Sequence, residues 1–429
     1  MPTILLAIYI ILIFIRPMDW WEPLIGLELV TAAAAITFTV GLPKILAWAP
    51  QAWRTIPQMR WGLALLASAV LSWLPTFWFG GMQNAFEQFG RLIFFFSLIL
   101  ILVNTKQDYK ILIWTFLGCA IWMAVHAILQ QRRGFGFGGQ TPLWRLRNVE
   151  TGEFVWQSKA FGTFEDPNDL CAILVIAIPM LYALYKASRH PVSKVISLAG
   201  VPICGYGAWC TNSRGGIVAI FGMLATYAIA RTKGIRRYLM ASASILLVTT
   251  VAPSRFGKGM VVRDRAVLWG DGISMFKDNP FFGVAYMEYP THQGESMMAH
   301  NTYVQILAEL GLIGYLPFFL IIYLTIVQLR RAIALKAHFP SADQFIMAGI
   351  FSSLAGYLTA MYFISRQYHH VLYVVLALSI TFLQSSSRSA GVLDQVIGNT
   401  RKDLKHGLYW GLGSIVVMWV TVRIANALG

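Results

Sequence analysis

The sequence has few charged residues and few cysteines, and both shortages narrow what the chain can be. Only 12% of its 429 residues are charged while 57% are hydrophobic, and the mean hydropathy is +0.60. This excess of apolar residues is larger than a soluble core of this length needs, so a soluble protein is excluded. The four cysteines lie mainly inside apolar segments, without paired spacing or neighbouring histidines. Neither a disulfide framework nor a zinc site is therefore expected.

Sequence motifs for nucleotides and metals are also missing. There is no Walker loop, no dinucleotide-type glycine motif and no Asp-x-Asp-type carboxylate pair in the loops predicted to face outward. We therefore expect no metal, no cofactor and a substrate that is already activated when it binds. The net charge of +15 is spread over short loops instead of one basic domain, so nucleic acid is not an expected partner.

Long apolar runs dominate what is present. Most are ~17–25 residues long, the length that a helix needs to cross a membrane. Helices are predicted over 3–15, 24–41, 61–79, 86–104, 109–130, 168–187, 194–211, 215–231, 238–252, 301–329, 344–364 and 370–385, with a further apolar run at 408–426. The predicted fold is all-α, a single integral membrane domain over residues 1–429 with about 12 membrane-spanning helices. Whether the first and last runs span the membrane or lie in its interface stays open.

Basic residues occur in alternate loops, which predicts the orientation of the chain. By the positive-inside rule these loops are cytoplasmic, so the segments 131–167 and 253–300 form two long loops on the opposite face. These two loops are also rich in Arg and Lys, which suggests an anionic partner on that face. Pairing with Asp and Glu of the same loops is the alternative.

Three polar segments fall on this outer face. Arg214 lies in the short turn Asn212-Ser213-Arg214-Gly215-Gly216, immediately before an apolar helix. The planar guanidinium of arginine binds phosphate through two parallel hydrogen bonds, and a helix N-terminus favours the same anion. An arginine that reaches toward lipid headgroups is the alternative interpretation.

The second segment begins at Arg263 and Arg265. Apolar residues follow at Leu268, Trp269, Ile273, Met275 and Phe276, and Asp278-Asn279-Pro280 ends the run. This pattern predicts a helix on the membrane surface in the second long loop, with an arginine able to reach the same anion as Arg214. A solvated charge on an amphipathic helix is the alternative.

The third segment is His300-Asn301, which opens a hydrophobic helix. A histidine that titrates near neutral pH, at a place where water is scarce, is a candidate general base. Its alternative role is to cap or anchor the helix. Glu309 lies nine residues further along, on another face, and is expected to make a structural hydrogen bond.

Two smaller groups complete the candidate residues. Asn168 or Asp169 is predicted to cap the helix that follows Phe161-Gly162-Thr163-Phe164-Glu165-Asp166-Pro167. Arg366 and His369 form a second basic group on the outer side that could contact lipid phosphate.

Together these segments resemble the O-antigen ligase and O-antigen polymerase superfamily of bacterial membrane glycosyltransferases. The resemblance rests on Ser213-Arg214-Gly215, on Arg265-x-x-Leu268-Trp269 with Asn279-Pro280-x-x-Gly283, on His300-Asn301 with Gly311, and on the segment that begins at Phe161. It covers roughly Phe161 to Gly314. A thirteenth apolar run and the acidic pair Glu165-Asp166 depart from the family pattern.

The resemblance implies a fold similar to the C-type glycosyltransferases, in a bacterial inner membrane with the active site facing the periplasm. It implies an undecaprenyl-diphosphate-linked glycan as donor, Arg214 and Arg265 as ligands of the diphosphate, and His300 as the base that activates the acceptor hydroxyl. The acceptor implied is lipid A–core. A second lipid-linked glycan, as in a polymerase, or a protein Ser or Thr, as in a protein O-oligosaccharyltransferase, remain alternatives, and an anion transporter is a further one.

Overall fold

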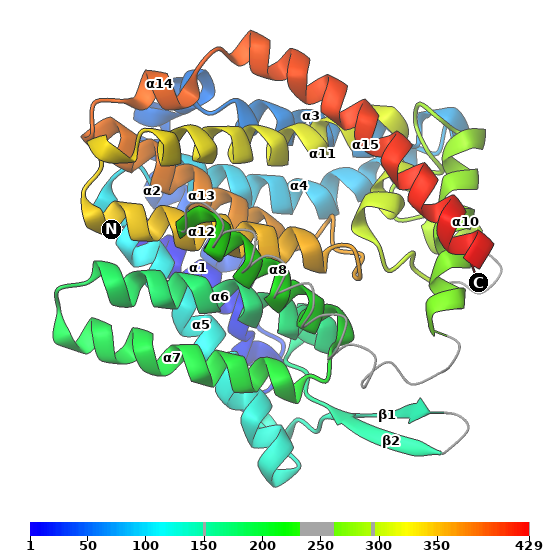
Figure 1. The fold of residues 1–429 in the computed structure, drawn as a ribbon, viewed down its shortest axis with the longest axis horizontal. Coiled ribbons are helices and arrows are strands. Elements are labelled where there is room, and N and C mark those ends of the chain that lie inside the picture. Colours follow the sequence, from blue (N-terminus) through cyan, green and yellow to red (C-terminus); the bar gives the residue numbers. More distant parts are fainter. Residues whose placement is uncertain (149–151, 232–260, 293–296, 429) are drawn as a thin grey trace.

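Long helices dominate the computed structural model, which describes residues 1–148, 152–231, 261–292 and 297–428 (Figure 1). The first half of the chain contains α1 (Pro2–Ile15), α2 (Leu29–Thr55), α3 (Pro57–Leu71), α4 (Phe79–Leu102), α5 (Lys106–Arg133), α6 (Pro167–Ala187), α7 (Pro191–Cys210) and α8 (Arg214–Arg231). The second half contains α10 (Val261–Asp278), α11 (Thr302–Ala334), α12 (Ser341–Ala360), α13 (His370–Ser389), α14 (Leu393–Ile397) and α15 (Thr400–Leu428). The helix predicted over 238–252 lies outside the described residues.

The predicted all-α membrane fold is confirmed. Eight of the described helices are long and apolar enough to cross a membrane, and they include those of the first and last apolar runs. α13 is the most enclosed of them and is buried on nearly all sides, as expected for a helix surrounded by other helices. α12 packs on α6 and α8, α6 packs on α7, and α11 packs on α3.

One end of the bundle collects the segments that the sequence singled out. α10 runs across the direction of the long helices there, and the C-terminus of α15 and the β-hairpin lie at the same end (Figure 1). We call this the α10 end. α10 stops at Asp278, where the Asp-Asn-Pro sequence was expected to end a helix.

The hairpin was not predicted. It consists of β1 (Leu143–Asn148) and β2 (Glu153–Gln157), paired antiparallel within what was expected to be an irregular loop. Trp144 and Trp156 are paired across the two strands, with ring centroids 4.9 Å apart. The hairpin is fixed to the turn between α7 and α8, because Asn212 Nδ2 donates to the Trp156 carbonyl at 2.8 Å.

The predicted end of the second helix was wrong. The helix was predicted over 24–41, which leaves Lys44 and Arg54 in the following basic loop, but α2 continues to Thr55 through Pro43 and Pro50. A proline inside a helix removes one hydrogen bond without ending the helix when the surrounding contacts hold the chain. Lys44 forms an ion pair with Asp108 of α5 at 2.9 Å, so its charge is compensated within the bundle.

α11 is broken at Gly311, where φ is +57° and ψ is −155°. At the break, backbone N–H and C=O groups of α11 lose their partners within the helix, and the segment after α10 supplies new ones. Leu312 N donates to the Pro280 carbonyl at 2.9 Å, and Val284 N donates to the Ala308 carbonyl at 2.9 Å. A Cβ atom on Gly311 would lie 2.4 Å from the Phe281 oxygen. The spacing of Pro280, Gly283 and Gly311 in the sequence therefore reflects close packing of two backbone segments.

Candidate functional site

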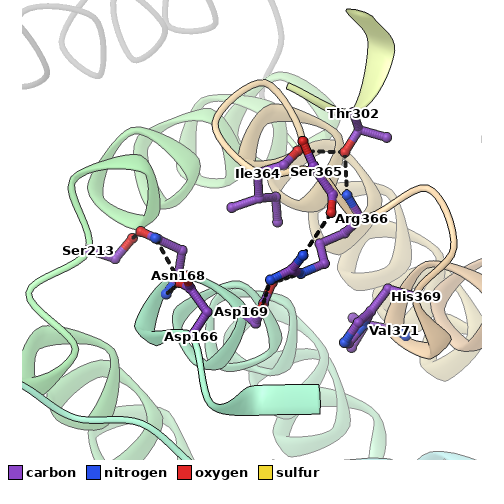
Figure 2. Close-up of polar contacts among 10 residues, drawn as sticks. All are labelled: Asp166, Asn168, Asp169, Ser213, Thr302, Ile364, Ser365, Arg366, His369 and Val371. Atoms are coloured by element: carbon purple, nitrogen blue, oxygen red, sulfur yellow. Dashed lines mark hydrogen bonds and ion pairs between the residues drawn. The ribbon is translucent and has the colours of Figure 1, made fainter. Parts of the chain in front are cut away.

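The first turn of α6 contacts the turn that carries Arg214. Asp166 caps α6, and its Oδ1 accepts from Asn168 N at 2.7 Å, so the predicted cap at Asn168 or Asp169 was wrong. Capping by Asp166 leaves the Asn168 side chain available, and its Oδ1 accepts from Ser213 Oγ at 2.7 Å (Figure 2). The start of α8 is thereby held against the start of α6.

Asp169 binds Arg366 across the same end of the bundle. Arg366 Nε donates to Asp169 Oδ1 at 2.6 Å and Nη2 donates to Oδ2 at 2.5 Å, a bidentate pair with a buried carboxylate. Burial lowers the pKa of the Arg366 guanidinium, but the charge and hydrogen bonds of Asp169 outweigh burial, so the net shift is upward. Arg366, predicted as a possible ligand of phosphate, binds a protein carboxylate in this structure.

Arg366 also connects this pair to the start of α11. Its backbone N donates to Thr302 Oγ1 at 2.9 Å, and Thr302 Oγ1 in turn donates to the Ile364 carbonyl at 2.6 Å (Figure 2). Asn301 is buried and caps α11, with Oδ1 accepting from Tyr303 N at 3.0 Å. His300 directly precedes this cap.

His300 has a backbone conformation that non-glycine residues seldom adopt. Its φ is +49°, in the left-handed region, and its side chain is partly exposed. Such a conformation persists only where neighbouring contacts fix it. Here those contacts are the Asn301 cap on one side and a hydrogen bond from Trp269 Nε1 to the Ala299 carbonyl, at 2.9 Å, on the other.

The Trp269 contact brings α10 to His300. Arg265 lies one helical turn before Trp269 on the same face of α10, and its side chain is partly buried. Gly272 permits the close approach of α10 to α11, since a Cβ atom there would lie 2.5 Å from Val304 Cγ1. The structure thus brings Arg265 and His300 to the same end of the bundle through adjoining contacts.

The remaining candidate residues are placed as follows. Arg214 is the first residue of α8 and Arg263 lies in the first turn of α10, but the side chains of both lie outside the described part of the structure. His369 is buried and caps α13 through Nδ1, which accepts from Val371 N at 3.3 Å. Within the described residues, no group of three His, Cys, Asp or Glu side chains is arranged to hold a metal ion.

Glu309 makes the structural hydrogen bonds that were expected of it. It is fully buried, and its carboxylate accepts from Gln305 Nε2 at 2.8 Å and from Gln367 Nε2 at 3.1 Å. Because Gln367 follows Arg366, this contact is a further connection between α11 and the segment that begins after α12.

Sequence reasoning missed the contacts that hold these parts together. Asn168 and Asp169 were named only as possible helix caps and Thr302 was not named, because the partners of all three are far away in the sequence. Their nearness to candidate residues was the only available signal.

We predict that Asp169→Asn weakens both the fold and the activity of the site. The amide keeps the shape but loses the charge paired with Arg366, which should lower the free energy of unfolding by ~1–3 kcal/mol. Displacement of the Thr302 contact beside His300 should also lower turnover by roughly tenfold or more. Thermal unfolding in detergent and a transfer assay measure the two effects.

Asp403→Asn is the matched control. Asp403 is a buried carboxylate that also binds an arginine through two hydrogen bonds, but its partner Arg331 lies near the opposite end of α11 from His300. A similar loss of stability with normal turnover is expected. Equal loss of turnover in both variants would mean that the Asp169 pair affects activity only through stability.

Comparison with known families adds an independent observation. Residues 199–319 match the family model described as O-antigen ligase. The match contains the Arg214 turn, all of α10, His300 and the break in α11, whereas the segment that begins at Phe161, on which the resemblance also rested, lies outside it. The predicted resemblance is confirmed. A search of curated proteins found no match.

Proposed function

We propose that the chain transfers a polysaccharide from undecaprenyl diphosphate to a hydroxyl of lipid A–core, and the match of residues 199–319 to the O-antigen ligase family model supports this proposal. The observation that carries this proposal is the convergence of the starts of α6, α8 and α11 with the middle of α10 at one end of the bundle, joined by the contacts of Ser213, Trp269 and Arg366. That end would face the periplasm of a bacterial inner membrane, where both lipids present their headgroups.

The transfer step assigns one role to each candidate residue. The acceptor oxygen forms a bond to C1 of the first sugar, the bond between C1 and the phosphate oxygen breaks, and its electron pair stays on the departing diphosphate. Arg214 and Arg265 stabilise that growing negative charge, and His300 takes the proton of the acceptor hydroxyl. Direct attack inverts the configuration at C1.

A polymerase or a protein O-oligosaccharyltransferase would use the same groups with a different acceptor. The description of the matched family favours the ligase. The break in α11 beside Glu309 is a feature that transporters also have. Here, however, the segment 280–285 occupies the released backbone groups, and Gln305 and Gln367 bind the carboxylate. These contacts argue against a transport site at Glu309.

Reconstitution with separate acceptors tests the proposal. Purified protein in proteoliposomes should join an undecaprenyl-diphosphate-linked glycan to lipid A–core, and undecaprenyl diphosphate should be released in equal amount. Neither a chelator nor the omission of nucleotides should reduce the rate, because the donor is already activated.

The control reactions offer a second lipid-linked glycan or a Ser-containing peptide as acceptor. Product with the lipid-linked glycan alone would identify a polymerase, and product with the peptide alone a protein glycosyltransferase. A strict need for a divalent cation would contradict the metal-free mechanism and direct attention to Glu165 and Asp166.

A further inference from the structure

A cavity of about 400 Å³ lies between α10 and α15, outside the contacts described above. Gly270, Ser274 and Lys277 line it from α10, and Trp419 and Arg423 line it from α15. Because α15 is a candidate membrane span that runs to Ile424, Trp419 and Arg423 lie at the end of that span. This is the level at which lipid headgroups meet a membrane protein.

Two cations in this cavity contact the same aromatic ring. Lys277 Nζ lies 6.0 Å from the centroid of the Trp419 ring, and Arg423 Cζ lies 5.7 Å from it. The Trp419 side chain is 41% exposed, and no carboxylate is among the residues that line the cavity. Within the described part of the chain, neither cation forms an ion pair with Asp or Glu.

Two uncompensated cations near one another repel, and an anion between them removes that cost. Tryptophan and arginine at the end of a single membrane helix often serve only as interfacial anchors. This arrangement differs because the second cation comes from another helix and the two helices line an open cavity between them. Such a cavity is suited to a phosphate group.

The cavity and the proposed transfer site share α10, but they use different faces of that helix. Arg265 and Trp269 lie on the α10 face that meets Ala299, whereas Gly270, Ser274 and Lys277 lie on the neighbouring face, about a third of a turn away. The cavity and the candidate diphosphate ligand Arg265 are therefore on different faces of the same helix, and Lys277 lies ~18 Å further along that helix than Arg265.

We propose that the cavity binds a phosphate on the headgroup of the acceptor lipid, with Lys277 and Arg423 as its ligands and Trp419 as the apolar wall. This inference rests on the proposed function, because it assigns the acceptor of that reaction to a phosphorylated glycolipid. Donor binding is left to Arg214 and Arg265. Removal of the charges of Lys277 and Arg423 should therefore weaken binding of the acceptor and leave binding of the donor unchanged.

The test uses Lys277→Gln, Arg423→Gln and the double variant in full-length protein reconstituted in nanodiscs. The double variant should raise the KM for phosphorylated lipid A–core by roughly tenfold, with kcat and the donor KM unchanged. Lys405→Gln is the matched control, since Lys405 also lies on α15 and contacts an aromatic ring, that of Tyr409, at 5.9 Å. It should behave as the unaltered protein does.

Lipid A–core treated with phosphatase separates recognition of phosphate from a structural effect. The unaltered protein should show the same roughly tenfold higher KM with this acceptor, and the double variant should lose nothing further. An equal loss with both acceptors would show that the two cations support the fold and would overturn the proposal. Unchanged KM values in the double variant would identify them as interfacial anchors and would also overturn it.

Binding without transfer separates this inference from the proposed function. Native mass spectrometry should detect phosphorylated lipid A–core bound to the unaltered protein and not to the double variant. Competition by phosphatidylglycerol but not by inorganic phosphate would assign the site to lipid headgroups, whereas equal competition by inorganic phosphate would overturn a lipid site. If the unaltered protein transfers no glycan but shows this difference in binding, the proposed function fails and the lipid site stands.

Discussion

Replacement of His300 by alanine should lower turnover by ~10²–10⁴-fold while donor binding is nearly unchanged. The expected loss follows from removal of the base that takes the acceptor proton, at a position where the backbone is fixed by the Asn301 cap and the Trp269 contact. Activity of the unaltered protein should fall as the pH drops through the range in which imidazole is protonated, because the protonated ring cannot accept a proton. Rates measured across pH with saturating donor provide the test.

Two further variants distinguish a role of His300 in proton transfer from a purely structural role. His300→Gln keeps a hydrogen-bonding side chain but cannot act as a base, so it should be nearly as slow as alanine and should lose the pH dependence. His292→Ala removes an exposed histidine from the same loop and should be silent. If the glutamine variant keeps the normal rate and pH profile, His300 only positions the acceptor, and the proton leaves to water or to the diphosphate.

Arg265→Ala and Arg214→Ala should each abolish detectable transfer while the protein remains folded in the membrane. Each variant removes a guanidinium that is proposed to stabilise the charge of the departing diphosphate, an interaction expected to be worth several kcal/mol in a site with little water. Lysine should restore activity only in part, because it has a single charged nitrogen in place of a planar fork.

Arg133→Ala is the control for the arginine variants. Arg133 is exposed at the last turn of α5 and takes part in none of the contacts that join α6, α8, α10 and α11. It should leave turnover unaltered, and the lifetime of each variant in detergent should match that of the unaltered protein. Normal transfer by both Arg214→Ala and Arg265→Ala would contradict the proposal that these arginines bind the diphosphate.

The membrane helices could be predicted because their signal is local. A run of apolar residues long enough to cross the bilayer forms its hydrogen bonds within itself, so its existence depends little on the rest of the chain. Its ends are less certain, as α2 shows: Pro43 and Lys44 read as a helix end, but packing and the ion pair to Asp108 carry the helix on to Thr55.

The contacts that organise the site could not be predicted, because they join distant residues. Asp169 and Arg366 are 197 positions apart, and nothing in either neighbourhood identifies the partner. The cap at Asp166 was missed since three polar residues within four positions can all cap a helix, and Asn168 and Asp169 make tertiary contacts instead. The motif residues Arg214, Arg265 and His300 were recognisable individually, but the groups that hold them were not.

The break in α11 has a consequence for how the protein is made. As one straight helix, Thr302–Ala334 would be about 50 Å long, well beyond the ~30 Å hydrocarbon thickness. The hydrogen bonds that compensate the break come from residues 280–285, which precede α11 in the sequence and are therefore synthesised before it. The ribosome and the insertion machinery can therefore deliver α11 as an ordinary apolar helix. We expect the break at Gly311 to form once α11 contacts residues 280–285, and His300 to reach its position at that late stage of assembly.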